Sequence, residues 1–167
     1  KAFRKRKNRV GVSWRMDETY IKLNGKWVYL YRAVDKYGFT VEFLLRAKRD
    51  GVAAKAFFRK AFKQHGKPEK ITVDKSRSNK CAVDFFNEGL EKEKQYEIRQ
   101  VKYLNNIVEQ DHRFIKKRTK IMLGFKSFYS ASETLSGIEN IRIIQKGQIS
   151  GQKPNQSAFE NFVELMA

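Results

Sequence analysis

Cysteine, histidine and proline are scarce in this chain of 167 residues, which has one Cys, two His and two Pro. A lone cysteine, Cys81, can form neither an internal disulfide nor a cysteine-based zinc site, and two histidines 47 positions apart argue against a zinc cluster. No apolar stretch approaches the roughly 18 residues that indicate a membrane span, and the basic start lacks the apolar core of a secretory signal. These absences favour a reducing, cytoplasmic setting.

Acidic residues are also few beside the basic ones, with 18 Asp+Glu against 36 Lys+Arg and a net charge of +18. Hydrophobic residues make up 41%, which argues against disorder and suffices for the core of a single domain. A globular protein this basic repels itself unless a polyanion is near, and nucleic acid is a more usual partner than an anionic membrane. Composition alone also suits a ribosomal or chromatin protein, so it predicts a partner without a reaction.

The first twelve residues carry six Lys or Arg and no acid. The chain shows no initiator Met there, so we expect residues 1–12 to be the remnant of a linker that follows an upstream segment. This linker is either a solvated tail or an arm that tracks DNA, and the sequence leaves both interpretations open.

The hydrophobic pattern predicts an α/β fold. Strands over 13–23, 26–34 and 39–45 form an antiparallel meander, with the hairpin signal Asn24-Gly25 between the first two. Helices and strands then alternate. We expect a helix from the N-cap Asp50 to His65, a strand over 70–73, a helix over about 78–90, a strand over 96–101, and helices over about 105–120, 130–146 and near the C-terminus. The order βββαβαβα predicts a mixed five-stranded sheet with helices on its faces, which is the order of the ribonuclease H-like fold.

Two carboxylates stand where surface solvation explains them poorly. Asp17 lies inside the strand "WRMDETY", where Asp has a low propensity, and Asp74 ends the apolar strand "ITVD", where open sheets place ligands. Phosphodiester chemistry with Mg²⁺ needs a few such carboxylates gathered at one end of a sheet. On pattern alone, Asp17 could instead be an exposed strand residue or part of a cross-strand salt bridge, and Asp74 a helix cap or turn residue.

A third acid lies on the helix over 105–120, and periodicity does not choose it. Asp111 falls near the middle of the apolar stripe, whereas Glu109 falls on the other side with Arg113 and Lys116. Glu109 could simply pair with Arg113 at the i,i+4 spacing, and Asp111 could be a buried residue paired with Arg118.

Three segments carry a family resemblance: "WRMDETYIKLNGKWVYLYRAVDKYG", "ITVDKS" and "VKYLNNIVEQDHRFIKKR". They resemble bacterial insertion-sequence transposases of the DDE class, and more narrowly insertion-sequence family six, along almost the whole chain. The resemblance implies a ribonuclease H-like catalytic core with a metal-binding Asp-Asp-Glu triad, which here is Asp17, Asp74 and Glu109. It also implies that the triad binds Mg²⁺ and that Mn²⁺ can replace Mg²⁺. The 34 residues between the last two acids match the family pattern, and Lys116 matches its basic residue seven positions after the Glu.

The resemblance also implies an activity and partners. The family cuts DNA at the ends of a mobile element and transfers the 3′-OH into target DNA, so the partners are double-stranded DNA with terminal inverted repeats, target DNA and further copies of the chain. The expected place is the bacterial cytoplasm, at the nucleoid. We expect residues 13–147 to form the catalytic domain and 148–167 a tail with a short helix. We expect a group of basic residues to track DNA phosphates: Lys116, Arg113, Lys117, Arg118 and Lys120. His112 is interpreted as a structural residue.

One departure from the family pattern bears on activity. Such relatives carry an N-terminal helix-turn-helix region that recognises the element ends, and this chain begins after it, so we expect a truncated protein. Two alternatives follow: a basic DNA-binding remnant without activity, or a ribonuclease H-like nuclease without strand transfer.

Overall fold

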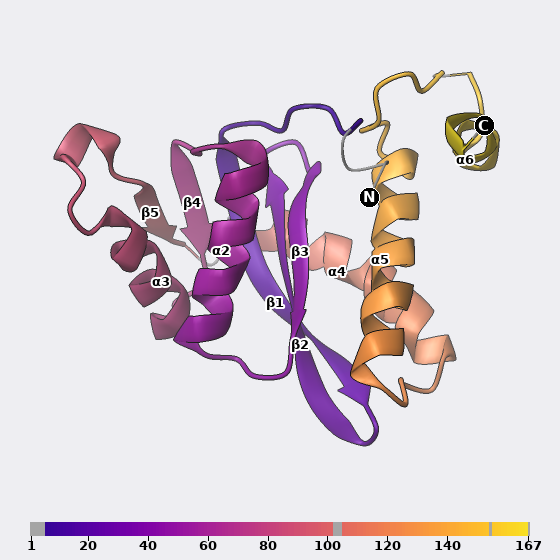
Figure 1. Ribbon diagram of the computed structural model, residues 1–167, viewed down its shortest axis with the longest axis horizontal. Helices are drawn as coiled ribbons and strands as arrows, with labels where there is room; N and C mark the ends of the chain where they lie inside the picture. The colour runs from indigo at the N-terminus through magenta and orange to yellow at the C-terminus, as the bar shows by residue number, and fades with distance from the viewer. Residues whose placement is uncertain (1–5, 102–104, 154, 167) are drawn as a thin grey trace.

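One mixed sheet forms the centre of the protein in the computed structural model, which describes residues 6–101, 105–153 and 155–166 (Figure 1). The strand order is β3-β2-β1-β4-β5. The pairs β1–β2 and β2–β3 are antiparallel, and the pairs β1–β4 and β4–β5 are parallel. The strands are β1 (Ser13–Leu23), β2 (Lys26–Asp35), β3 (Thr40–Arg46), β4 (Lys70–Val73) and β5 (Glu97–Gln100). The predicted mixed five-stranded sheet is therefore confirmed.

Local sequence explains both turns of the meander. Asn24 and Gly25 adopt positive φ values of 46° and 78°, as the tight hairpin between β1 and β2 requires. At the next turn, the carboxylate of Asp35 accepts hydrogen bonds from the backbone N–H groups of Tyr37 and Phe39, each at 2.9 Å. The same carboxylate accepts from the N–H of Gly11, which ties the basic N-terminal segment to the sheet.

Helices cover both faces of the sheet. On one face lie α2 (Gly51–His65) and α3 (Arg77–Asn87), and on the other α4 (Asn106–Ile121) and α5 (Phe128–Gln145). Helix α6 (Ala158–Met166) packs against α5, and a short 3₁₀ turn lies at Lys92–Lys94. Asp50 caps α2 as predicted, because its carboxylate accepts from the N–H of Ala53 at 2.8 Å. Helix α3 ends earlier than the predicted Leu90, since Gly89 turns to a φ of 77°. Within the described ranges, no helix combines the length and apolarity needed to cross a membrane.

Alternation along the strands creates two cores. On one face, Trp14, Met16 and Tyr31 pack with α2 and α3, including the buried Phe57 and Val83. On the other face a second set of apolar side chains packs with α4 and α5: Ile21, Leu30, Phe43, Ile115 and Leu135. Successive residues of β1 therefore point into different layers, so Asp17 and Glu18 do as well.

Candidate active site

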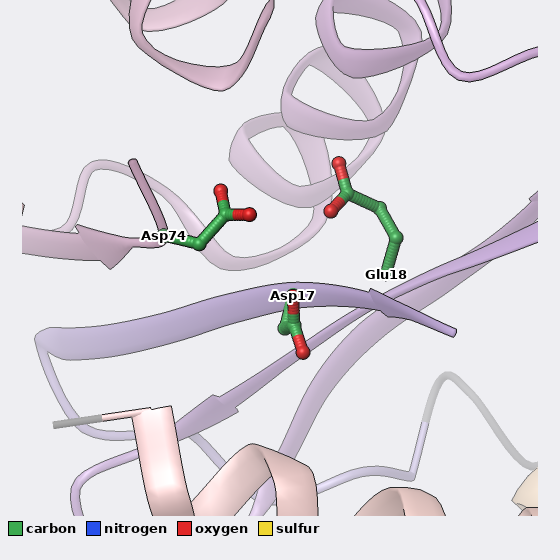
Figure 2. A group of neighbouring side chains, drawn as sticks. All are labelled: Asp17, Glu18 and Asp74. Atoms are coloured by element: carbon green, nitrogen blue, oxygen red, sulfur yellow. The ribbon is translucent and has the colours of Figure 1, made fainter. Parts of the chain in front are cut away.

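Three carboxylates meet where β1 and β4 part. The ladder between these strands ends at the pair Arg15 and Thr72, and Asp74 follows directly after β4. One carboxylate oxygen each of Asp17, Glu18 and Asp74 lies within 4.8 Å of the others. Figure 2 shows the carboxylates of Glu18 and Asp74 facing each other on one side of β1, with Asp17 on the other side. The fold thus brings together two of the three predicted acids and adds Glu18.

This acidic group carries more negative charge than its surroundings neutralise. Burial, together with repulsion from Glu18, Asp74 and Glu109, raises the pKa of the Asp17 carboxyl to about 7. Burial also raises the pKa of Glu18, although Arg49 opposes this. The Oε1 atom of Glu18 is buried and has no hydrogen-bond partner within 3.5 Å among the described residues, although the Asn79 side chain is near enough to lower the pKa of Glu18. Oxygen ligands with surplus negative charge and an unpartnered oxygen fit a hard divalent cation.

Asp74 is held in place through both of its oxygens. Its Oδ1 accepts hydrogen bonds from the Ser76 backbone N–H at 3.0 Å and from the Asn79 amide at 3.2 Å. Its Oδ2 accepts from Nη2 of Arg49 at 3.1 Å, and the same nitrogen donates to Oε2 of Glu18 at 3.2 Å. Asp74 is therefore a turn residue before α3 and a member of the acidic group at once, and Arg49 bridges two members of that group.

Helix α4 brings Glu109 and His112 to the Asp17 side of the sheet. Glu109 is exposed in the first turn of α4 and lies outside the group of carboxylates within 4.8 Å, but its charge contributes to the raised pKa of Asp17. His112 is buried, with Nδ1 3.8 Å from Oδ2 of Asp17. Burial, together with the cations Arg32 and Lys116, lowers the pKa of His112 to about 3, so the ring is neutral near pH 7.

Asp111 belongs to a separate, buried ion network. Its carboxylate lies 2.7 Å from Nη2 of Arg32, 2.7 Å from Nζ of Lys146 and 3.1 Å from Nε of Arg142. The hypothesis of an Asp111–Arg118 pair is therefore wrong. Arg118 lies about 10 Å further along the helix axis, whereas these three cations come from β2, from α5 and from the residue that follows α5. The described residues also show no ion pair between Glu109 and Arg113.

The five cations predicted to track DNA phosphates lie on one helix. All but Arg118 are exposed, as phosphate contacts require: Arg113, Lys116, Lys117 and Lys120. The guanidinium of Arg118 instead stacks on the Phe114 ring, 4.0 Å from the ring centroid.

Comparison with known proteins identifies the family. A family model described as a DDE domain matches residues 11–148. The chain belongs to the DDE transposases of insertion-sequence family six. The Staphylococcus aureus (strain Mu50) transposase for insertion sequence-like element IS431mec is 41% identical over 144 residues, which are 86% of this chain and 62% of that protein. The S. aureus transposase for element IS257 in transposon Tn4003 gives the same values. The chain thus spans less than two thirds of the length of these relatives.

Solved structures show the same fold as this transposase-family chain. The catalytic core domain of BIV integrase matches with a TM-score of 0.54 at 12% identity, over 92% of this chain and 95% of that one. The HTLV-2 integrase catalytic core domain, solved in complex with magnesium, matches with a TM-score of 0.52 at 18% identity, over 66% of this chain and 70% of that one. The predicted ribonuclease H-like fold is confirmed.

The sequence analysis did not predict Glu18 or Arg49 at the site, and it interpreted His112 as a structural residue only. Glu18 follows Asp17 in a strand that is covered on both faces, so two adjacent acids there were already a signal. His112 follows Glu109 by three positions, which places both on the same side of a helix. Arg49 carried no local signal, because its contacts with Glu18 and Asp74 depend on how the loop before α2 folds back over β1.

Proposed function

We propose that this chain is the catalytic core of a transposase that cuts DNA at the ends of a mobile element and joins the freed 3′ end to target DNA. The observation that carries this proposal is the under-neutralised group of Asp17, Glu18 and Asp74 in the sheet of a DDE-family chain. A ribonuclease H-like fold supports it, because that fold is shared with integrase catalytic cores.

The proposed metal ligands are Asp17, Asp74 and Glu109, with Glu18 as a fourth carboxylate at the same place. Mg²⁺, or Mn²⁺ in its place, supplies when bound the positive charge that activates the attacking oxygen and stabilises the leaving one. The residues fit such a cation because Asp17 is costly to ionise without one and Glu18 Oε1 has no hydrogen-bond partner within 3.5 Å among the described residues. Neutral His112 adds no competing charge beside Asp17.

The proposed reaction has two steps that use one site. First, a water oxygen bonds to the phosphorus at the element end, the P–O3′ bond breaks, and the departing 3′ oxygen takes up a proton. Next, that 3′-OH loses its proton and bonds to a phosphorus of target DNA, whose own P–O3′ bond breaks and whose 3′ oxygen is protonated. The second step exchanges one phosphodiester for another, so neither an energy source nor a covalent protein–DNA link is needed.

The proposed partners are double-stranded DNA, both terminal inverted repeats and target, and further copies of the chain assembled on it at the bacterial nucleoid. The phosphate-binding residues would be Lys116, Arg113, Lys117, Arg118 and Lys120. Each phosphate they neutralise makes the log–log salt dependence of duplex binding steeper by about 0.9.

Replacing Asp17 by Asn tests the proposal. With Mg²⁺, wild-type protein should nick duplex DNA and join a pre-cut 3′-OH end to a supercoiled plasmid, and Asp17→Asn should reduce both reactions to background. Duplex binding, followed by fluorescence anisotropy, should persist or tighten because a negative charge is lost. Mg²⁺ should also raise the melting temperature of the wild type but not of Asp17→Asn, since only a bound ligand stabilises the fold. Asp84→Asn is the matched control, because Asp84 is an exposed acid on α3 paired with Lys80 at 3.3 Å.

Each other outcome supports a different function or contradicts the assigned site. Wild-type chain that binds DNA but never cuts it, with either metal ion, is a DNA-binding remnant. Cleavage without joining of the pre-cut end indicates a nuclease, and an active Asp17→Asn variant overturns the assigned site.

A further inference from the structure

A cavity of about 720 Å³ opens beside the tip of the β1–β2 hairpin, at the end of α4. We call it the aromatic groove. The residues that line it include two exposed aromatic rings, one aliphatic side chain and three lysines: Tyr20, Trp27, Leu123, Lys22, Lys116 and Lys120. It lies apart from the contacts between Asp17, Glu18 and Asp74 described above.

Backbone hydrogen bonds hold the groove open. The N–H of Phe125 donates to the carbonyl of Lys22 at 3.0 Å, and the N–H of Asn24 donates to the carbonyl of Phe125 at 2.6 Å. Gly124 allows this approach: its φ is 96°, and a Cβ atom there would lie 3.3 Å from the Lys22 carbonyl oxygen. The loop after α4 is thus fixed to the hairpin, and the groove exists before any ligand binds.

The aromatic surface of the groove is unusually open to solvent. Tyr20 is 50% exposed, Trp27 58% and Leu123 93%. The Tyr20 ring packs edge-on against Trp27, with centroids 6.1 Å apart, and also contacts Tyr29, with centroids 5.4 Å apart. These contacts orient the rings without covering them, which suits a ligand with a flat apolar face.

The charges around the groove select the class of ligand. Lys22, Lys116 and Lys120 line it, and no acid is among the described residues that do so. A second copy of a chain with net charge +18 would place like charges against these lysines, whereas a nucleic acid strand brings phosphates. Aromatic faces interleaved with lysines are how proteins hold unpaired strands, since bases stack on the rings and phosphates meet the cations.

The groove also lies near the acidic group along β1. Beyond Arg15 the ladder with β4 ends, and β1 runs on from Asp17 to Tyr20 over three residues, or about 10 Å. On α4, Lys116 lies almost two turns from Glu109, on the same side of the helix. A strand seated in the groove would therefore have its neighbouring phosphates close to the acidic group.

We propose that the aromatic groove binds unpaired bases of a DNA strand whose adjoining phosphates enter the acidic group. Tyr20 and Trp27 stack on the bases, and the three lysines hold the intervening phosphates. A closed duplex hides its base faces, so the groove favours a frayed or displaced end. The inference rests on the proposed function, because it assigns the DNA strand to that same site.

The test compares a short single-stranded oligonucleotide with the same strand made abasic at consecutive positions, which keeps the phosphates. Binding is measured by fluorescence anisotropy in EDTA with the full chain. We expect the abasic strand to bind wild type at least about fivefold more weakly, because each lost stacking contact is worth about 1–3 kcal/mol, or about five- to 150-fold in affinity. Trp27→Ala should weaken binding of the intact strand by a similar factor but leave the abasic strand almost unchanged. Phe159→Ala on α6, an aromatic that is 74% exposed, is the matched control.

Two further variants keep the test sharp. Trp27→Phe should restore binding of the intact strand, since a phenyl ring still stacks, and it guards against a folding defect in Trp27→Ala. Lys120→Ala should lower the log–log salt slope by about 0.7 for intact and abasic strands alike. Equal binding of intact and abasic strands by wild type overturns the proposal. The proposal is also overturned if Trp27→Ala and removal of the bases weaken binding independently, so that their effects add.

A protein partner gives a different result. If Leu123→Ser abolishes a concentration-dependent self-association in sedimentation and leaves strand binding intact, the groove is an interface between copies and the proposal fails. Because these measurements are made without metal, they are separate from cleavage. If Asp17→Asn still cleaves DNA but binding depends on the bases and on Trp27 as expected, only the proposed function is overturned. If Asp17→Asn abolishes cleavage but binding does not depend on the bases, only the proposal for the groove is overturned.

Discussion

Two sets of carboxylates flank the start of α4, and they differ in how their charge is balanced. In the group of Asp17, Glu18 and Asp74, Arg49 pairs with Glu18 and Asp74, and burial together with mutual repulsion raises the pKa of Asp17 to about 7. The second set is the buried network, in which two carboxylates meet three cations: Asp111, Glu139, Arg32, Arg142 and Lys146. There burial alone would raise the pKa of Asp111, but Arg32 and Lys146 outweigh it and lower the pKa to about 2.

The difference in charge balance indicates different roles: the acidic group suits an exchangeable cation, and the buried network stabilises the fold. In the buried network, three cations already neutralise the two carboxylates. The network therefore serves to hold parts of the fold together and not to bind a further cation. Its members come from β2, α4 and α5, and Asp111 lies two residues after Glu109. The network therefore fixes the helix that carries the proposed third metal ligand, while the acidic group beside it is left short of positive charge.

The largest effect should come from removing the centre of the network. Arg32 is fully buried and donates to both Glu139 and Asp111. Arg32→Met leaves these two carboxylates buried without that partner, so we expect the free energy of unfolding to fall by about 3–5 kcal/mol, measured by urea denaturation. Arg59→Met, at an exposed arginine on α2, should change it by less than about 0.5 kcal/mol.

A combined variant checks the cause. Changing Arg32, Asp111, Glu139 and Lys146 together to apolar residues of similar size should recover most of the loss, because no buried charge of the network is then left unpaired and the side chain of Arg142 reaches solvent. A single Arg32→Met variant as stable as wild type would show that the network does not clamp the fold.

A smaller effect should separate the two acids of α4. Asp111→Asn leaves three cations facing one carboxylate, and we expect a loss of about 1–3 kcal/mol in urea denaturation. Glu109→Gln changes an exposed side chain, so unfolding should shift by less than about 0.5 kcal/mol while Mg²⁺-dependent cleavage falls to background. If Asp111→Asn abolishes cleavage in a stable protein and Glu109→Gln does not, the two roles are exchanged.

Strand alternation and turn residues were enough to predict the sheet. The Asn24-Gly25 hairpin and the Asp50 cap are set by residues within four positions of each other, so the sequence states them directly. The sequence also predicted that Asp17 and Asp74 belong to a cluster of carboxylates, because an acid within or at the end of an apolar strand is unusual.

The partners of each acid could not be predicted, because they come from distant segments. Arg32 reaches Asp111 across 79 positions and Glu139 across 107, and no pattern within α4 indicates this. Helical periodicity could therefore place Asp111 on the buried side without showing that cations saturate it there. For the same reason Arg49, 31 positions from Glu18, was not foreseen.

The smallest effect should come from Arg49, the cation that pairs with Glu18 and Asp74. Arg49 is partly exposed, and its bonds to Glu18 and Asp74 compete with a bound ion for the same oxygens. Arg49→Ala should therefore tighten Mn²⁺ binding about fivefold, which corresponds to about 1 kcal/mol, as measured by isothermal titration calorimetry without DNA. Lys48→Ala is the matched control, because Lys48 is an exposed cation in the same loop. Weaker Mn²⁺ binding by Arg49→Ala would mean that Arg49 positions Asp74 instead of neutralising it, and unchanged binding would mean that neither bond persists in solution; either result breaks the contrast between the two sets of carboxylates.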